Sequence, residues 1–378
     1  MRALAVLVLS LVGVSTAVAS PALAAITTET LLTFDAPTTS AAGILPTADG
    51  RYLLATDTYN NLLLRYDLRT HVWLTAIPVS PQPIGVDVTS DGKTAVIGGM
   101  NGIDIVNLAT RHVTSIPHLT GYEGVAITPD NKFAYVANYA NDCVSIVSLQ
   151  SKSFVSDVST GASSSPEYLT VSPDGSKVYV ADVAADQVSV ISTATRSVTG
   201  SIVVSGQPYS IAISPNGSHL YVGSIANDTV SIIATSNLSV EVTVPGNAHT
   251  DGVTVSPDGS QFAVTSLWSD DVLVYSTSTN ALLQTVTLTT ASSQPNVPVY
   301  APNGAYLYTA TGGSASVTQL TIDPPLAPPT PTPTTTVQPL PDTGQNFTPA
   351  IVAAAILVVG GAVLWALAAV ARRRKARD

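Results

Sequence analysis

The sequence predicts an all-β fold, a seven-bladed β-propeller of four-stranded antiparallel blades. The main observation is a turn of Asx-Gly type that recurs seven times between residues 26 and 323, flanked each time by short strands of alternating apolar residues. A repeat of about 42 residues that holds four strands is typical of a propeller blade. The second residue of each turn follows the previous one by 39 to 45 positions: Gly50, Gly92, Asn131, Gly175, Gly217, Gly259 and Gly304.

The fourth copy shows how each repeat is read. Residues 169–171 form the strand before the turn at Asp174-Gly175, and residues 178–181 form the strand after it. Residues 188–191 and 201–204 supply the third and fourth strands. Asx and Gly both accept the positive φ that a tight hairpin requires, so the turn joins two antiparallel neighbours.

The ends of the repeat array predict how the ring closes. The seventh copy, residues 295–323, has room for only three strands, and residues 28–34 precede the first copy without a blade of their own. We expect residues 28–34 to form the outer strand of the last blade. This would close the ring and leave no free sheet end where the chain begins and ends.

One stretch of the array resembles a known repeat family. Residues 172–181 (SPDGSKVYVA), followed by residues 188–195 (VSVISTAT), resemble the YVTN-type propeller repeat. The resemblance covers about residues 28–323 and implies the propeller fold. It leaves the function open, because this fold hosts lactonases, lyases, electron-transfer proteins and binding modules.

The N-terminus predicts export. Arg2 precedes an apolar run and a small-residue exit at Ala24-Ala25, so residues 1–25 are expected to be a signal peptide. Without the leader and the basic C-terminal tail, nine basic residues face 24 acidic ones. This excess of negative charge opposes a phosphate backbone, so a nucleic-acid partner is not expected. The one cysteine excludes an intrachain disulfide.

The C-terminus predicts a tether. Residues 324–339 are rich in Pro and Thr and are expected to form an extended stalk. Residues 340–378 contain Leu340-Pro341-Asp342-Thr343-Gly344, then an apolar stretch at 348–371 long enough for a transmembrane helix, then a basic tail. This order resembles the LPxTG sorting signal of Gram-positive surface proteins.

The sorting-signal resemblance implies a location and two partners. A sortase would cut between Thr343 and Gly344 and join Thr343 to the cell-wall peptide, so the protein would be extracellular and anchored to the wall of a Gram-positive bacterium. The precursor would be held in the membrane by its C-terminal helix. A plain single-pass membrane protein, in which no cleavage occurs, is the alternative.

The common register predicts which residues surround the central opening. Loops that lead into the innermost strands share one face of a propeller, and polar or aromatic side chains in this register, together with Trp268 of a nearby loop, are the candidate ligand-binding residues: Gln82, Glu123, Glu167, Gln207, Tyr209, His249, Asp251, Trp268, Gln294 and Asn296. Glu123, Glu167 and Asp251 come from different blades and could share Ca²⁺. The amides could bind sugar or peptide hydroxyls. Solvated loop residues without a ligand are the alternative.

These features favour a non-catalytic binding or adhesion module, a monomer that presents its face to an extracellular glycan or protein. No catalytic residue and no cofactor other than calcium is assigned. Two alternatives stay open, a propeller-type lactonase or lyase and a structural component of the cell surface. Related enzymes use a clustered His, Glu and Arg set or a metal, whereas the predicted rim has no arginine and one histidine.

Overall fold

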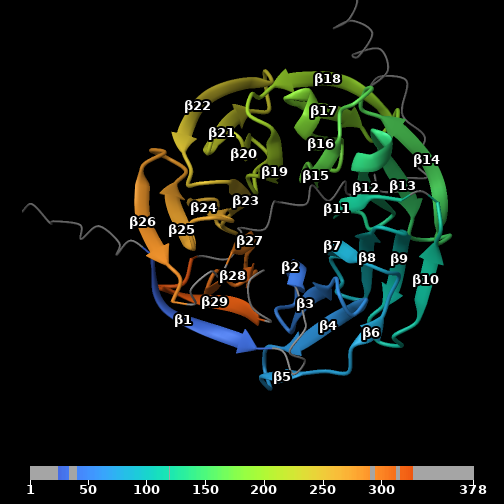
Figure 1. Ribbon diagram of the computed structural model, residues 1–378, viewed down its shortest axis with the longest axis horizontal. Helices are drawn as coiled ribbons and strands as arrows, with labels where there is room; N and C mark the ends of the chain where they lie inside the picture. The colour runs from blue at the N-terminus through green and yellow to red at the C-terminus, as the bar shows by residue number, and fades with distance from the viewer. Residues whose placement is uncertain (1–23, 34–40, 119, 290–293, 312–315, 327–378) are drawn as a thin grey trace, which may run out of the picture. The chain divides into compact units, whose positions relative to one another are not determined.

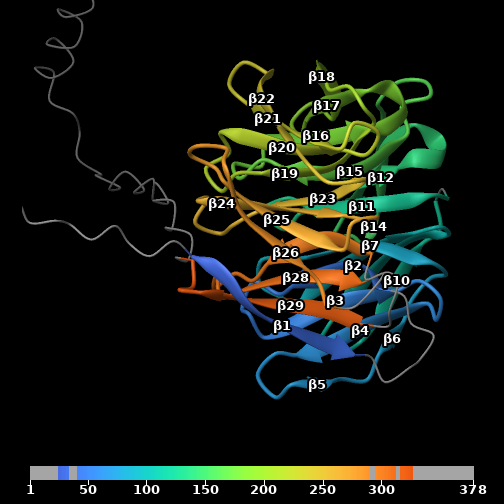
Figure 2. The ribbon, with the colours of Figure 1, turned by 60° about the vertical axis from the view of Figure 1, so that its left-hand side comes forward.

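The predicted propeller is present in the computed structural model, which describes residues 24–33, 41–118, 120–289, 294–311 and 316–326. These residues form seven antiparallel sheets around one axis, seen end-on in Figure 1 and from the side in Figure 2. Each sheet is a blade whose strands run in order from the axis outward. The fold class inferred from the turn repeat is therefore confirmed for this part of the chain.

The strands of each blade are named by their distance from the axis. The inner strands are β2 (Ala41–Pro46), β7 (Pro83–Val88), β11 (Tyr122–Ile127), β15 (Pro166–Val171), β19 (Pro208–Ile213), β23 (Thr250–Val255) and β27 (Pro295–Tyr300). The second strands are β3 (Tyr52–Asp57), β8 (Thr94–Gly99), β12 (Phe133–Asn138), β16 (Lys177–Asp182), β20 (His219–Ser224), β24 (Gln261–Ser266) and β28 (Tyr306–Thr311).

The third strands are β4 (Leu62–Asp67), β9 (Gly102–Asn107), β13 (Cys143–Ser148), β17 (Gln187–Ser192), β21 (Thr229–Ala234), β25 (Asp271–Ser276) and β29 (Ser316–Asp323). The outer strands are β10 (Val113–Ile116), β14 (Ser153–Ser159), β18 (Ser197–Val203), β22 (Ser239–Pro245), β26 (Leu282–Thr287) and β1 (Ala25–Thr33). In the first blade two short segments, β5 (Val72–Trp73) and β6 (Ile77–Pro78), take the place of one outer strand.

The seven Asx-Gly-type turns join inner and second strands, as their sequence predicts. The second residue of every turn has a positive φ, between 58° at Asn131 and 73° at Gly217 and Gly259. Side chains reinforce the turns: the Ser172 hydroxyl donates to Asp174, which also accepts the backbone N–H of Ser176. Local turn chemistry thus fixes the register of each hairpin.

The ring closes through the N-terminal strand, as expected. β1 pairs antiparallel with β29, with Ala25 opposite Asp323 and Thr33 opposite Ser316, so the last blade runs β1-β29-β28-β27. The side chain of Gln284, on the neighbouring blade, makes two further bonds to the backbone of β1. It accepts from the N–H of Ile26 and donates to its carbonyl, both at 2.9 Å.

Apolar side chains fill the space between neighbouring blades, while the inner strands approach one another closely at the axis. Tyr135, Tyr179 and Tyr221 occupy the same position of their second strands and are buried in successive interblade cores. Near the axis, a Cβ on Gly124 would lie 2.7 Å from the carbonyl oxygen of Glu167 on the next inner strand. Such contact leaves no room for a side chain there, and it brings neighbouring hub residues together.

The ordered ring continues a little beyond the repeat array. Leu326 is buried, and its N–H donates to the Gly304 carbonyl, so the first residues assigned to the stalk pack against the last blade. The rest of the predicted stalk, the sorting signal and nearly all of the signal peptide lie outside the described residues. Within the described part of the chain, no helix has the length and apolar character of a membrane span.

Candidate functional site

A repeated side-chain device shapes the loops that lead into the inner strands. In five blades an Asx residue just before the third strand accepts the N–H of the residue that precedes the next inner strand, at 2.7 to 3.1 Å. Donor and acceptor residues both have positive φ. The pairs are Asn61 with Gln82, Asp142 with Ser165, Asp186 with Gln207, Asp228 with His249, and Asp270 with Gln294.

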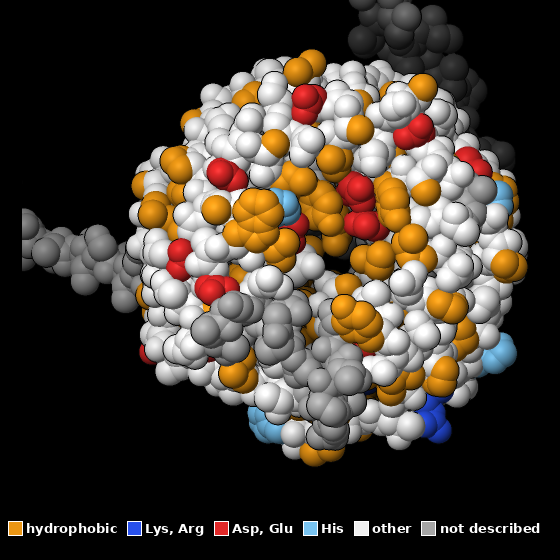
Figure 3. Space-filling model, in the orientation of Figure 1, with side chains coloured by type: hydrophobic (Ala, Val, Ile, Leu, Met, Phe, Trp, Pro, Cys, Tyr) orange, Lys and Arg blue, Asp and Glu red, His pale blue; other side chains and the backbone are white. Residues whose placement is uncertain are grey.

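The second residue of each inner strand lies at the mouth of the central opening, and in five blades the Asx bond holds the loop just before that strand. Around the ring these residues are Ala42, Ile84, Glu123, Glu167, Tyr209, Asp251 and Asn296. The first two blades therefore contribute apolar side chains, and the next four contribute carboxyl and phenol groups. Figure 3 shows acidic side chains gathered beside the opening, with hydrophobic side chains near them. We call Glu123, Glu167, Tyr168, Tyr209 and Asp251 the hub cluster.

Glu123 and Glu167 form a coupled pair of carboxyl groups. Burial, and then the neighbouring Glu123, raise the pKa of Glu167 well above its usual range. When both are ionised, Oε2 of Glu167 is buried without a hydrogen-bond partner. A proton on Glu167 removes this deficit, because the acid can then donate to the Glu123 carboxylate. Two adjacent carboxyl groups that hold one proton are an arrangement suited to acid–base chemistry.

Asp251 is the most deeply buried carboxyl group of the cluster. It is 4% exposed, and its side chain has no hydrogen-bond or salt-bridge partner among the described residues. Burial, and then the charge of Glu123, raise its pKa to about 7. A carboxyl group in this state costs folding free energy as soon as it ionises.

Two tyrosines connect these acids. The Tyr209 hydroxyl donates to Oε2 of Glu123 at 3.3 Å. Its ring lies 5.2 Å from the ring of Tyr168, tilted by 59°. Burial, with the nearby charges of Glu123 and Asp251 among the further causes, raises the pKa of both phenols well above the usual range. The phenols therefore stay protonated and remain hydrogen-bond donors.

An apolar channel continues from the hub cluster into the ring. It has a volume of about 290 Å³, and all seven inner strands contribute to its lining. Leu169, Ile211 and Val253 are among its aliphatic side chains, and Tyr168 reaches it from the hub cluster. The site thus combines a polar, acidic mouth with a hydrophobic interior.

The residues predicted from the register fall into two groups, those inside the hub cluster and those outside it. Glu123, Glu167, Tyr209 and Asp251 belong to the hub cluster. The amide oxygen of Asn296 accepts the N–H of Val297. The three glutamines are exposed, and the hydrogen bonds found at them among the described residues use their backbones: Gln82, Gln207 and Gln294.

His249 and Trp268 form a separate aromatic pair on the rim. Their ring centroids are 4.5 Å apart with a 39° tilt, and Trp268 is 70% exposed. His249 donates its backbone N–H to Asp228, whereas its Nδ1 is buried without a partner.

The calcium site expected at Glu123, Glu167 and Asp251 is not assembled. The described residues, which include these three, contain no group of three or more His, Cys, Asp or Glu side chains placed to hold a metal ion. Burial and the neighbouring Glu123 raise the pKa of Glu167 and of Asp251, so both carboxyl groups favour the protonated form when no cation is bound.

Tyr168 is the member of the hub cluster that the sequence interpretation missed. It occupies the third position of β15, where four other inner strands carry glycine: Gly43, Gly85, Gly124 and Gly252. Alignment of the seven repeats at this position would have revealed Tyr168, because it is the one aromatic residue among mostly small side chains.

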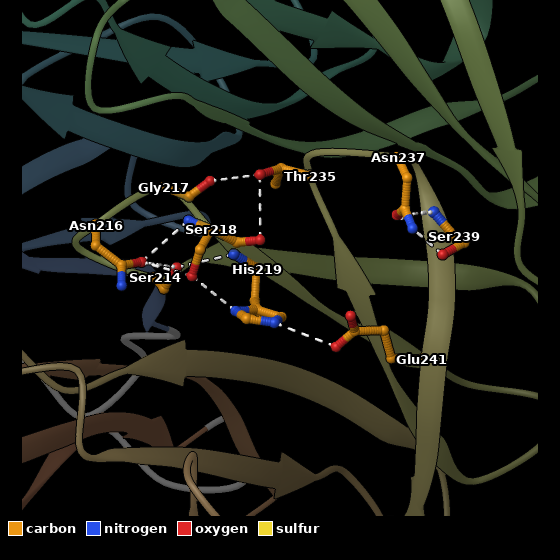
Figure 4. Close-up of polar contacts among 9 residues, drawn as sticks. All are labelled: Ser214, Asn216, Gly217, Ser218, His219, Thr235, Asn237, Ser239 and Glu241. Atoms are coloured by element: carbon orange, nitrogen blue, oxygen red, sulfur yellow. Dashed lines mark hydrogen bonds and ion pairs between the residues drawn. The ribbon is translucent and has the colours of Figure 1, made fainter.

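A second polar network, far from the hub in the fifth blade, has the connectivity of a Ser–His–Glu relay (Figure 4). The Ser218 hydroxyl lies 2.7 Å from Nδ1 of His219, and Nε2 of His219 lies 3.2 Å from Glu241. Ser218 also bonds to the turn residue Asn216, as Ser176 and Ser260 bond to the matching aspartates of neighbouring blades. We therefore assign Ser218 to turn formation.

Fold and hub together define a seven-bladed propeller with a carboxyl-rich site at its axis. Residues 156–367 match the family described as "Lactonase, 7-bladed beta-propeller". The match covers more than half of the chain, and the protein belongs to this family. A search of curated proteins gives no match.

Several solved structures share the fold. Hydrazine synthase of Kuenenia stuttgartiensis is 19% identical with a TM-score of 0.67, over 76% of this chain and 97% of that one. A streptogramin B lyase is 14% identical with a TM-score of 0.69, over 78% and 98%. Virginiamycin B lyase from Staphylococcus aureus is 14% identical with a TM-score of 0.68, over 78% and 99%. At these identities the similarity is one of fold.

Proposed function

We propose that the protein is a hydrolase of the lactonase kind, whose hub cluster opens a lactone or a related ester by acid–base chemistry. The observation that carries the proposal is the adjacent pair of carboxyl groups, Glu123 and Glu167, at the mouth of the cavity, where burial and then the neighbouring Glu123 raise the pKa of Glu167. Perturbed carboxyl groups at the mouth of a cavity are typical of catalytic sites, and membership of the lactonase family supports the same reaction class.

The two glutamates have complementary roles in this proposal. Glu123 accepts a proton from water while the water oxygen attacks the carbonyl carbon of the lactone. Glu167 donates its proton to the ring oxygen as the carbon–oxygen bond breaks, which yields the hydroxy acid. Glu123 then holds the proton and Glu167 is ionised. Transfer of that proton along their shared hydrogen bond restores the starting state, so one water molecule is consumed in each cycle.

Conservative substitutions test the assignment. Glu123→Gln and Glu167→Gln keep the shape of each side chain but remove the base and the acid, and each is expected to lower kcat/KM on a panel of uncharged lactones by about 10² to 10⁴. Wild-type activity should fall on the alkaline side as Glu167 loses its proton. Continuous titration of the acid product measures both effects.

Glu241→Gln is the matched control. Glu241 lies in β22, is half-exposed and pairs with His219, so removing its charge should leave turnover unchanged. A wild-type protein that is inert on the whole panel, or full activity in Glu167→Gln, would contradict the proposal.

A second function, the binding of an extracellular glycan without turnover, is favoured by the exposed Trp268 stacked near His249. Flat aromatic surfaces on a rim suit sugar rings, and the exposed Gln207 and Gln294 offer amides close to the same loops. Inertness on lactones, together with glycan-array binding that Trp268→Ala abolishes, would select this function. Calcium can be included in the same array as a separate condition.

The proposed place of action is the cell surface of a Gram-positive bacterium. The support is the sequence alone: a leader at 1–25, a Pro/Thr-rich stalk, and the Leu340–Gly344 pentapeptide followed by an apolar stretch and a basic tail. A sortase and the cell-wall peptide would be the partners of the tether, and the ring would meet ligands outside the cell.

A further inference from the structure

We propose that the hub cluster recognises a substrate with an ammonium group on a short apolar frame, with Asp251 as the counter-ion. This inference deepens the proposed function and rests on it for the reaction. It names the chemical class of the substrate, an amine-bearing lactone or ester.

The first argument is the unmatched charge of the site. Asp251 is 4% exposed and unpartnered, and Glu123 lies close enough to affect it electrostatically. No lysine, arginine or histidine belongs to the hub cluster or to the lining of the apolar channel below it. A buried carboxylate without a partner is unfavourable, and a ligand cation would supply the missing charge. An anionic substrate, such as a phosphorylated lactone, would be repelled.

The second argument is the aromatic surface beside the acids. Tyr168 and Tyr209 lie 5.2 Å apart and both feel the charge of Asp251. Phenol rings next to carboxylates attract ammonium and quaternary ammonium groups through the negative faces of the rings. A neutral polar ligand would gain no comparable binding free energy from the two tyrosine rings.

The third argument is the shape of the cavity. Ala42 and Ile84 occupy the matching hub positions of the first two blades, and the channel beneath is lined by aliphatic side chains within about 290 Å³. A compact apolar group attached to the ammonium can therefore enter the channel while its charge stays at the mouth. The site is amphipathic, and so should be its ligand.

Calorimetry with two probes tests recognition without any need for turnover. Hexyltrimethylammonium and 1-hexanol share an alkyl chain and differ in charge. We expect the ammonium to bind the purified protein at least tenfold more tightly than the alcohol. Asp251→Asn should weaken the binding of the ammonium by about 30-fold or more, because it removes one partner of a buried charge pair. The affinity for the alcohol should stay the same. Glu241→Gln changes the net charge by the same amount but lies in β22, outside the hub cluster, so it should change the affinity for neither probe.

Turnover separates this inference from the proposed function. γ-Butyrolactone and its derivative with a trimethylammonium substituent differ only in the cation, so the second should show the lower KM. Equal KM values, together with equal binding of the two hexyl probes, would overturn the inference and leave the lactonase proposal standing. Tight ammonium binding with no turnover of either lactone would refute the lactonase proposal. It would still support the proposal that the hub cluster binds a cation.

Discussion

At the scale of single residues, two acids of the hub cluster lie in surroundings that disfavour their charged forms. Asp251 is buried without a partner, and burial, followed by the neighbouring Glu123, raises the pKa of Glu167. Neither arrangement helps the ring to fold. Side chains that lower stability and converge on a cavity are characteristic of functional sites, where a strained environment is retained for activity.

Asp251→Asn should therefore stabilise the protein at alkaline pH. The folded-state pKa of Asp251 lies above its ordinary value, at about 7, so the folded state binds more protons than the unfolded state between these values. The contribution of Asp251 to the free energy of unfolding is therefore most favourable below pH 4, and it is lost as the pH rises to about 7. We expect the substitution to raise the free energy of unfolding at pH 8 by about 1 to 3 kcal/mol.

Urea unfolding at pH 8 and at pH 4.5 measures this effect. The gain should be small at the lower pH, where Asp251 is protonated in the folded state. A loss of stability at pH 8 would show that the carboxylate has a favourable partner after all.

At the scale of elements, the close approach of neighbouring inner strands fixes the geometry of the hub. A Cβ on Gly85, in β7, would overlap the carbonyl oxygen of Glu123 in β11. The inner strands of the second and third blades therefore touch backbone to backbone, and any change at Gly85 acts directly on a hub residue.

Gly85→Ala should destabilise the ring by about 1 to 3 kcal/mol, the usual cost of overpacking, and should also lower lactone turnover by displacing Glu123. Gly200→Ala in β18 is the control, because its Cβ would meet only a side-chain carbon of Leu238 at an ordinary 3.5 Å. Thermal melts and turnover are compared for both. An unchanged melting temperature in Gly85→Ala would show that the inner strands can separate easily.

The elements were the most predictable part of the molecule. The Asx-Gly turns determine where hairpins form, because these residues readily accept the positive φ that the turn requires. The alternation of apolar and polar residues on either side of each turn then identifies the strands. The register also placed Glu123, Glu167, Tyr209 and Asp251 at one opening. It could not show that burial and Glu123 raise the pKa of Glu167, since that depends on the lateral distance between blades, which no local pattern encodes.

The same limit applies to the other rim residues. The register selected Gln82, Gln207 and Gln294 for their side chains, and the structure adds that the backbone N–H of each bonds to an Asx side chain just before a third strand, at a left-handed φ. That bond joins loops of adjacent blades. For calcium, the register brought three acids to one opening, but it could not show whether their carboxyl groups are placed to share an ion, and the described residues contain no such group of three.

At the scale of the whole ring, stability depends on the contact between the two ends of the array. β1 pairs along β29, and Gln284 holds the backbone of Ile26 from the adjacent blade. Without β1, one side of β29 would expose unpaired N–H and C=O groups, a known route to association between sheets.

Deleting residues 26–33 should lower the melting temperature and cause aggregation. Gln284→Ala, which removes two hydrogen bonds but leaves the strand, should cost about 1 to 3 kcal/mol. Circular dichroism melts and size-exclusion chromatography follow both variants. A deletion variant that stays monomeric with wild-type thermal stability would mean that the N-terminal strand does not hold the ring closed.

The position of β29 has a mechanical consequence. This strand is held on one side by β1 and on the other by β28, and the chain after it packs against the last blade as far as Leu326. A pull on the chain beyond Asp323 would load two ladders of hydrogen bonds lengthwise at once, instead of peeling them open one at a time. Under the proposed cell-surface tether, drag on the propeller would thus act on a doubly supported strand.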